Sequence, residues 1–117
     1  MTRRTAAALF DVDGTLVDSN YLHAVTWWDA FLQAGHEVSM ARIHRAVGMG
    51  SDQLLDELLP EYRDRDDDAG IRTAHSALYS TYWSRLRPLP HAPSCCGHAR
   101  NADCGWYWPA RPTSRRR

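Results

Sequence analysis

The chain has 117 residues, in which 14 Arg balance 14 Asp and Glu, and 44% of the residues are hydrophobic. This length suffices for one domain, and the zero net charge excludes a chain that is strongly basic or acidic throughout. No apolar run approaches the roughly 20 residues that a membrane-spanning helix needs, and no apolar signal segment follows Arg3 and Arg4, so we expect a cytoplasmic protein that makes no use of a membrane.

The first predicted element is a β-strand at residues 6–12, a short apolar run that ends at two carboxylates. Asp11 and Asp13 are two residues apart, so in an extended chain their side chains point to the same side. Gly14 and Thr15 then turn the chain. Open α/β sheets bind ligands at this end of a strand, and the two acids are therefore candidate site residues.

Two carboxylates at one point fit phosphoryl chemistry. One can attack phosphorus and form an acyl phosphate. The other can protonate the leaving oxygen and then deprotonate the attacking water. Both acids repel a phosphate, so a hard divalent cation is expected, and Mg²⁺ suits carboxylate and carbonyl oxygens. Gly14 lets the backbone come close to the ligand, and turn amides can hold phosphate oxygens.

The residues from Phe10 to Ser19 read Phe-Asp-Val-Asp-Gly-Thr-Leu-Val-Asp-Ser. They resemble the first motif of the haloacid dehalogenase-like superfamily, which is Asp-x-Asp-Gly-Thr after an apolar strand. The resemblance implies an α/β fold with a Rossmann-like core, represented here by its first strand. It implies Asp11 as nucleophile and Mg²⁺ ligand, and Asp13 as general acid and base with its backbone carbonyl on Mg²⁺. Gly14 and Thr15 become candidate substrate contacts.

Asp13 and the composition of the chain separate the branches of that superfamily. True dehalogenases lack an acid at this position, because a leaving halide needs no proton. The phosphonate-cleaving branch uses a cap lysine, and this chain contains no lysine. The expected activity is therefore Mg²⁺-dependent hydrolysis of a small phosphorylated metabolite, either a sugar phosphate or phosphoglycolate.

Four helices are predicted after the motif, because apolar residues recur every three to four positions. Gly35 is expected to end the first helix, Ser39 to cap the second and Pro60 to stop the third. An acidic triplet at residues 66–68 is predicted to lie in a solvated connector. The four helices are expected at about residues 20–35, 40–47, 51–59 and 69–86.

The four helices occupy the place of the helical cap that many members of the superfamily insert after the first core strand. The predicted organisation is a first strand and nucleophile loop at 1–19, a cap at 20–87 and a tail at 88–117. Residues 43–50 read Ile-His-Arg-Ala-Val-Gly-Met-Gly and are similar to a cap segment of phosphoglycolate phosphatase and β-phosphoglucomutase relatives. That similarity makes Arg45 a candidate substrate contact. The alternative is a surface arginine on an amphipathic helix.

Histidines and aromatic residues of the predicted cap are expected to pack or to lie on the surface, rather than to bind a metal or a ring. The histidines concerned are His23, His36, His44 and His75, and the aromatic residues are Trp27, Trp28, Tyr79, Tyr82 and Trp83.

The composition changes abruptly near Pro88. Residues 1–87 hold 9 Arg against 13 acidic residues, a net charge of −4, whereas residues 88–117 hold 5 Arg against Asp103 alone, a net charge of +4. All three cysteines lie in the second part. A change of this kind marks a boundary.

The tail has a second reading. If the gene is translated in the frame that starts at the third base of each present codon, GC-rich codons give a sequence close to Ala-Glu-Leu-Leu-Arg-Ala-Arg-Ala-Glu-Arg-Gly-Leu-Arg-Val-Val-Leu-Ala-Ser-Ser. This shifted sequence has the pattern of an amphipathic helix, a glycine and an apolar strand. This reading resembles the second strand and second motif of the superfamily. We therefore interpret the residues after about Pro90 as an out-of-frame and disordered tail on a truncated chain.

If the tail is out of frame, its apparent motifs do not indicate a function. Its cysteines do not have the spacing of a structural zinc site, so no zinc is expected. Its arginines and aromatic residues could contact nucleic acid, but off-frame GC-rich codons produce such residues without selection, so no nucleic-acid partner is expected.

Two other functions stay open at this stage. A β-phosphoglucomutase-like phosphotransferase would share both acids and the cap. A non-catalytic helical fragment would share the ancestry without activity, and we expect these 117 residues alone to be inactive because a lone strand is not stable. The oligomeric state is not predicted.

Overall fold

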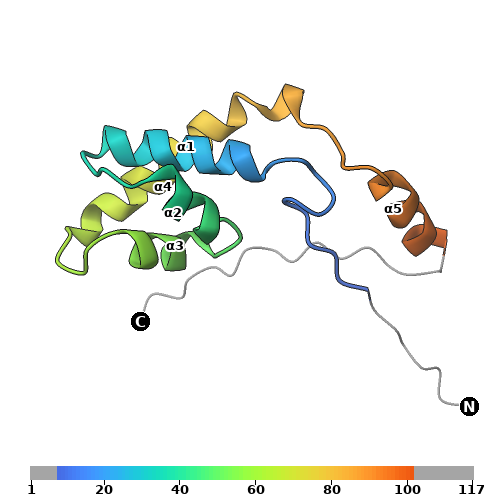
Figure 1. Ribbon diagram of the computed structural model, residues 1–117, viewed down its shortest axis with the longest axis horizontal. Coiled ribbons are helices and arrows are strands. Elements are labelled where there is room, and N and C mark those ends of the chain that lie inside the picture. The colour runs from blue at the N-terminus through green and yellow to red at the C-terminus, as the bar shows by residue number, and fades with distance from the viewer. Residues whose placement is uncertain (1–7, 102–117) are drawn as a thin grey trace, which may run out of the picture.

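The computed structural model describes residues 8–101, and for residues 96 and 98–101 it describes the backbone alone. Figure 1 shows helices α1 to α4 gathered in one bundle, with α5 apart from it and a turn of the N-terminal segment between the two. The elements are α1 Asn20–Gln33, α2 Met40–Ala46, α3 Ser51–Leu58, the 3-10 helix η1 Arg65–Asp67, α4 Asp68–Ser80, the 3-10 helix η2 Trp83–Arg85 and α5 Ala92–Asn101.

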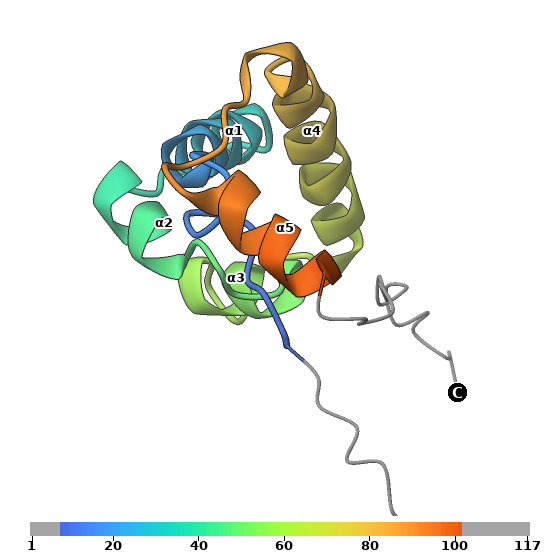
Figure 2. The ribbon, with the colours of Figure 1, turned by 90° about the vertical axis from the view of Figure 1, so that its right-hand side faces the viewer.

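The bundle forms around one apolar cluster. Viewed from the side, α1, α2, α3 and α4 surround a common interior, and α5 lies in front of them (Figure 2). Phe31 of α1, Ile43 of α2 and Leu55 of α3 are fully buried there, and Ile71 of α4 is 2% exposed. Burial of each such side chain contributes about 1.5 to 3 kcal/mol, so these side chains hold the four helices together.

The predicted helix ends are confirmed at two positions. Gly35 has a φ of +80°, and the amides of Gly35 and His36 donate to the carbonyls of Leu32 and Phe31, a pairing that glycine favours at the end of a helix. The Ser39 hydroxyl accepts a hydrogen bond from the Arg42 amide and caps α2. The fourth predicted helix is shorter than expected, because α4 ends at Ser80 and η2 follows.

The prediction of a solvated acidic connector is wrong for Asp68. The Arg63 side chain, 3% exposed, donates from Nε and Nη2 to the two carboxylate oxygens of Asp68 at 2.9 and 3.0 Å, and from Nη2 to Asp56 at 2.7 Å. Hydrogen bonds from Arg63 hold the pKa of Asp68 below its ordinary value. Asp68 is therefore a structural acid that joins the start of α4 to the segment after α3.

The predicted first strand is not formed in the described part of the chain. Residues 8–12 are extended, but they belong to no ladder, and the bridges recorded for residues 8–101 are isolated ones, such as Val17 to Pro88. Leu9 is 97% exposed. A strand needs neighbours to accept its backbone hydrogen bonds, and no other strand lies within the described range, which explains the difference.

Residues 16–18 lie beside residues 87–89. The Asp18 amide donates to the Arg87 carbonyl at 2.9 Å, and the Leu89 amide donates to the Leu16 carbonyl at 2.9 Å. These two bonds bring together the two ends of the segment that contains α1 to η2, which is the predicted cap.

The expectation of a disordered tail does not hold for residues 92–101, which form α5. His91, with a φ of +68°, precedes this helix. The rest of the predicted tail, residues 102–117, lies outside the described residues. Between residues 8 and 101, the helices are too short or too polar to cross a membrane.

Candidate active site

A tight turn follows the extended N-terminal segment and presents both candidate acids. The Val12 carbonyl accepts hydrogen bonds from the amides of Thr15, Leu16 and Val17, and the Gly14 amide donates to the Val17 carbonyl at 2.8 Å. Gly14 has a φ of +73°, and a Cβ at this position would collide with the side-chain amide of Asn20. Only glycine fits the turn without strain.

Asp11 is exposed, and within the described part of the chain one side-chain hydrogen bond holds it. The Thr15 hydroxyl donates to Asp11 Oδ2 at 2.8 Å. This bond restricts the rotation of the carboxylate, and Oδ1 has no hydrogen-bond donor among the described residues. Thr15, predicted to contact substrate, thus also orients the candidate nucleophile.

Asp13 has a different environment. The Ser19 hydroxyl, on a residue only 1% exposed, donates to Asp13 Oδ1 at 2.6 Å. His23 Nε2 lies 3.1 Å from the same oxygen, which is ion-pair distance for a protonated imidazole, although this buried nitrogen makes no hydrogen bond within the described residues. The two acids of the turn therefore have separate partners, which is what two different chemical roles require.

A stack of rings from α1 and α4 holds His23 in place. The His23 ring lies 4.0 Å from the ring of Tyr79, with 17° between the planes. His75 lies 5.5 Å from His23 and stacks on Trp27 at 4.0 Å. Burial, and to a smaller extent the nearby negative charge of Asp13, raises the pKa of Tyr79. The stack therefore connects the acidic turn to the core of the bundle.

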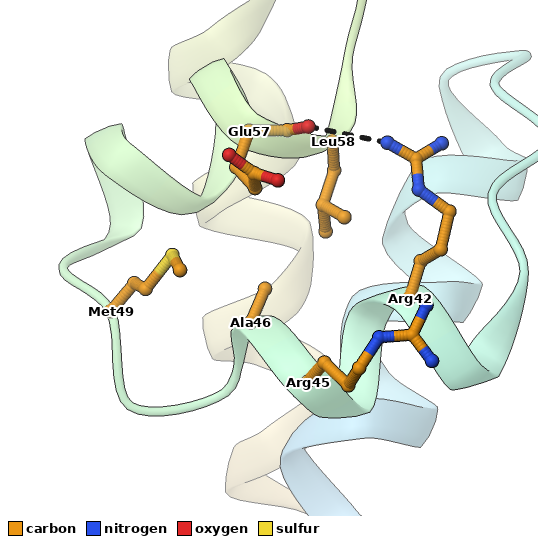
Figure 3. A pocket seen from close by; sticks show the side chains of 6 residues that line it. All are labelled: Arg42, Arg45, Ala46, Met49, Glu57 and Leu58. Carbon is orange, nitrogen blue, oxygen red and sulfur yellow. Dashed lines mark hydrogen bonds between the residues drawn. The ribbon is translucent and has the colours of Figure 1, made fainter.

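Arg45, the predicted substrate contact, lies in a different place. It lines a small pocket between α2 and α3 with Arg42, Ala46, Met49, Glu57 and Leu58 (Figure 3). Arg42 donates to the Glu57 carbonyl at 3.2 Å across this pocket. No hydrogen bond or ion pair among the described residues joins Arg45 to Asp11 or Asp13.

The pocket at Arg45 is small. Its volume of about 110 Å³ corresponds to roughly three or four water molecules at about 30 Å³ each, well below the roughly 300 to 1,000 Å³ of a small-molecule site.

Comparison with known proteins gives the family. The family model of haloacid dehalogenase-like hydrolases matches residues 5–107, which include the turn, the bundle and α5. The chain belongs to the haloacid dehalogenase-like hydrolases. No curated protein matches the chain.

A solved structure agrees with this assignment. The chain is similar to the crystal structure of a hydrolase from Pseudomonas syringae, with a TM-score of 0.75 and 27% sequence identity over 82% of this chain. The match covers 44% of that protein, so the chain spans less than half the length of the solved hydrolase. The predicted fold class, a haloacid dehalogenase-like α/β fold that is mostly helical in this chain, is confirmed.

The residues of the turn fit a Mg²⁺ ion only in part. Within residues 8–101, no group of three His, Cys, Asp or Glu side chains could hold a metal. Mg²⁺ keeps several waters, however, and one or two carboxylates usually suffice. Asp11 and Asp13 are exposed on one turn, and Asp11 Oδ1 has no described donor, so the turn could supply the Asp11 carboxylate and the Asp13 carbonyl to the ion.

Sequence reasoning missed two residues of the site, Ser19 and His23. Ser19, which precedes α1, stands four residues before His23 of α1, and both side chains lie beside Asp13. That spacing places two polar side chains on one helical face directly after an acidic motif. This spacing is the feature of the sequence that could have identified Ser19 and His23. The contribution of Tyr79 could not be found in this way, because it comes from α4.

Proposed function

We propose that the acidic turn is the phosphoryl-transfer site of a Mg²⁺-dependent phosphomonoester phosphatase. The substrate would be a small phosphorylated metabolite, either a sugar phosphate or phosphoglycolate. One observation carries the proposal: Asp11 and Asp13 lie on one turn, and each has its own hydroxyl donor, Thr15 for the first and Ser19 for the second. Family membership supports hydrolase chemistry.

The proposed reaction has two steps. In the first, an oxygen of Asp11 attacks phosphorus, the ester bond breaks, and the leaving oxygen takes a proton from Asp13. In the second, Asp13 takes a proton from water, which attacks the phosphoaspartate, so that phosphate leaves and Asp11 is restored. When bound, Mg²⁺ would offset the negative charge that the acids and the phosphate bring together.

The 117 residues alone are proposed to be catalytically incomplete. The second candidate function is therefore a non-catalytic helical chain. It is supported by the observation that residues 8–12 lack neighbouring strands within the described range. The position of Asp11 and Asp13 then depends on an unsupported segment. Catalysis is sensitive to such placement, since a misplacement of about 1 Å can cost about a hundred-fold in rate.

A chimera tests the proposal. Residues 8–90 replace the matching segment of the Pseudomonas syringae hydrolase, and hydrolysis of p-nitrophenyl phosphate is measured with and without Mg²⁺. We expect Mg²⁺-dependent turnover that Asp11→Asn abolishes. Asp18→Asn is the matched control, because this exposed acid of the same segment has no proposed role, and it should leave turnover unchanged.

Two results would contradict the phosphatase. One is a folded chimera without turnover, and the other is turnover that persists in the Asp11→Asn variant. The unmodified 117-residue chain is measured in parallel and is expected to show a helical circular dichroism spectrum without turnover.

A further inference from the structure

Asn20, the first residue of α1, has its side chain against the acidic turn. A Cβ built on Gly14 would overlap the side-chain nitrogen of Asn20 and would lie 2.6 Å from its Cγ and 2.7 Å from its Oδ1. The Asn20 side chain is half-buried, and it makes no hydrogen bond with the described residues. Its carboxamide therefore meets the turn by packing on the Gly14 backbone.

The peptide group that joins Asp13 to Gly14 is bonded at one end and free at the other. Its N–H donates to the Val17 carbonyl at 2.8 Å, whereas the Asp13 carbonyl accepts no hydrogen bond from the described residues. The peptide is trans, so its N–H and C=O point in opposite directions and the carbonyl is directed away from Val17. This carbonyl is therefore available to a ligand of the turn.

Glycine makes this peptide group easy to reorient. Gly14 has a φ of +73°, and glycine populates positive and negative φ about equally readily. Rotation about the N–Cα bond of Gly14 would turn the peptide group and with it the Asp13 carbonyl. The Asn20 carboxamide occupies space that the rotating backbone would need, and steric overlap of this kind restricts φ and ψ.

We infer that Asn20 is a positioning residue of the acidic turn: its carboxamide, packed on Gly14, fixes the direction of the Asp13 carbonyl. The inference rests on the proposed function, in which this carbonyl is a ligand of Mg²⁺. The Ser19 hydroxyl orients the side chain of Asp13, and Asn20 adds control of the backbone that follows it. Because Asn20 belongs to α1, the packing also couples the turn to the helical bundle.

Amide hydrogen exchange in the 117-residue chain, followed by NMR, tests the packing without metal or catalysis. Asn20→Ala removes the carboxamide and keeps a good helix former at the start of α1. The amides of Gly14 and Leu16 bond to carbonyls within the turn, and in this variant we expect both to exchange about ten-fold faster. Exchange at Ala30 and Phe31, in the core part of α1, should not change.

Asn20→Leu separates packing from hydrogen bonding. Leucine has the same branching as asparagine and no polar atom in its side chain. If the carboxamide acts by packing, the turn amides of this variant should exchange within about two-fold of the unmodified chain. Tyr21→Ala is the control, because Tyr21 is 73% exposed and stacks on His44 at 4.8 Å, and it should leave the turn amides unchanged.

A double variant identifies Gly14 as the residue that Asn20 contacts. Gly14→Ala places a Cβ against the carboxamide and should accelerate exchange at Leu16. In the Asn20→Ala background the same Cβ meets no carboxamide, so this acceleration should be at least about three-fold smaller. The cost of a positive φ for alanine is common to both backgrounds and cancels in the comparison.

The Mg²⁺ requirement of the chimera connects the turn to the proposed reaction. Asn20→Ala should raise the Mg²⁺ concentration for half-maximal turnover by about ten-fold, because the Asp13 carbonyl is no longer held in place, and Asn20→Leu should leave it unchanged. An unchanged Mg²⁺ requirement in an active Asn20→Ala chimera would contradict the role of Asn20 toward the carbonyl.

Three exchange results would also overturn the inference: unchanged exchange at Gly14 and Leu16 in Asn20→Ala, equal acceleration in the turn and at Ala30, or exchange in Asn20→Leu as fast as in Asn20→Ala. The second result would give Asn20 a role in the helix alone, and the third would make its amide a hydrogen-bonding group. Exchange does not depend on turnover, so a failure of the proposed phosphatase and a failure of this packing give different results.

Discussion

His23 Nε2 lies 3.1 Å from Asp13 Oδ1 without making a hydrogen bond, while the Ser19 hydroxyl donates to that same oxygen at 2.6 Å. Asp13 is the acid proposed to move the proton. The imidazole of His23 beside it is held by ring stacking and not by a hydrogen bond to Asp13. This buried nitrogen could bond Asp13 after a small rotation of the ring.

Replacement of His23 by phenylalanine should separate stability from activity. His23→Phe keeps a ring against Tyr79 and removes a buried nitrogen that makes no hydrogen bond within residues 8–101, so the free energy of unfolding should change by less than about 1 kcal/mol. In the chimera, turnover should fall by about ten-fold or more, because Asp13 loses the imidazole nitrogen that lies 3.1 Å from its Oδ1. Urea denaturation and turnover measure the two effects, and an equal loss in both would contradict this account.

Removal of the Ser19 hydroxyl should loosen the turn and leave the helix intact. Ser19 precedes α1, but its side chain makes no capping hydrogen bond. Ser19→Ala should therefore cost about 0.5 to 1.5 kcal/mol through the lost bond to Asp13, with unchanged helical content by circular dichroism. Ser39→Ala, which removes the cap of α2, is the contrasting variant. If Ser19→Ala reduced helical content as much, Ser19 would act on the helix and not on Asp13.

Arg63→Met should destabilise the bundle strongly. Asp68 would lose two hydrogen bonds from the guanidinium while its side chain stays only 12% exposed. We expect a loss of about 2 to 3 kcal/mol, below the roughly 3 to 5 kcal/mol of a fully buried pair. Arg65→Met is the control, because Arg65 is exposed and, among the described residues, its side chain bonds Asp56 alone, and it should cost less than about 1 kcal/mol.

The same ion pair gives a pH dependence with a definite sign. The pKa of Asp68 is lowered in the folded chain, so its contribution to stability is present above the ordinary carboxyl range and is lost as the pH falls through the lowered value. Arg63→Met should flatten this loss below the ordinary carboxyl range. Thermal denaturation measured over this range in the variant and the unmodified chain would show the difference, and parallel curves would contradict it.

His75 should make the bundle less stable in mild acid. Burial, and then the neighbouring His23, lower the pKa of His75 from 6.5 to about 4. Between these values the unfolded chain binds the proton and the folded chain does not, so stability falls as the pH is lowered from about 6.5 to about 4. After allowance for its partial exposure, the loss from pH 7 to pH 5 should be about 1 kcal/mol.

Urea denaturation of His75→Phe at the two pH values checks this assignment. The variant keeps the stack on Trp27 and should lose most of the difference between pH 7 and pH 5. His36→Gln is the control, because His36 lies outside the ring stack, and it should retain the difference. An unchanged pH dependence in His75→Phe would place the responsible group elsewhere.

Local signals were sufficient for the helices and for the acidic motif. The turn at Gly35, the cap at Ser39 and the stop at Pro60 depend on neighbouring residues, and the structure agrees with them. The juxtaposition of Asp11 and Asp13 with Gly14 was readable for the same reason, since the motif is continuous in sequence.

Non-local partners explain what the sequence did not show. The strand at residues 6–12 was predicted from its apolar run, but its formation depends on neighbours that residues 8–101 do not contain. Asp68 was predicted to be one of three solvated acids, because the sequence does not show that Arg63 pairs with it. His23 gained its position from Tyr79 of α4, which is distant in sequence.

The most direct test of the account is the identity of the residue that carries the phosphoryl group. The chimera is mixed with p-nitrophenyl phosphate and Mg²⁺, quenched during turnover and reduced with borohydride, which converts an aspartyl phosphate to homoserine, and the peptides are then sequenced by mass spectrometry. The account predicts homoserine at position 11 and aspartate at positions 13 and 18. Homoserine at another position, or turnover with Asp11 unmodified, would contradict it.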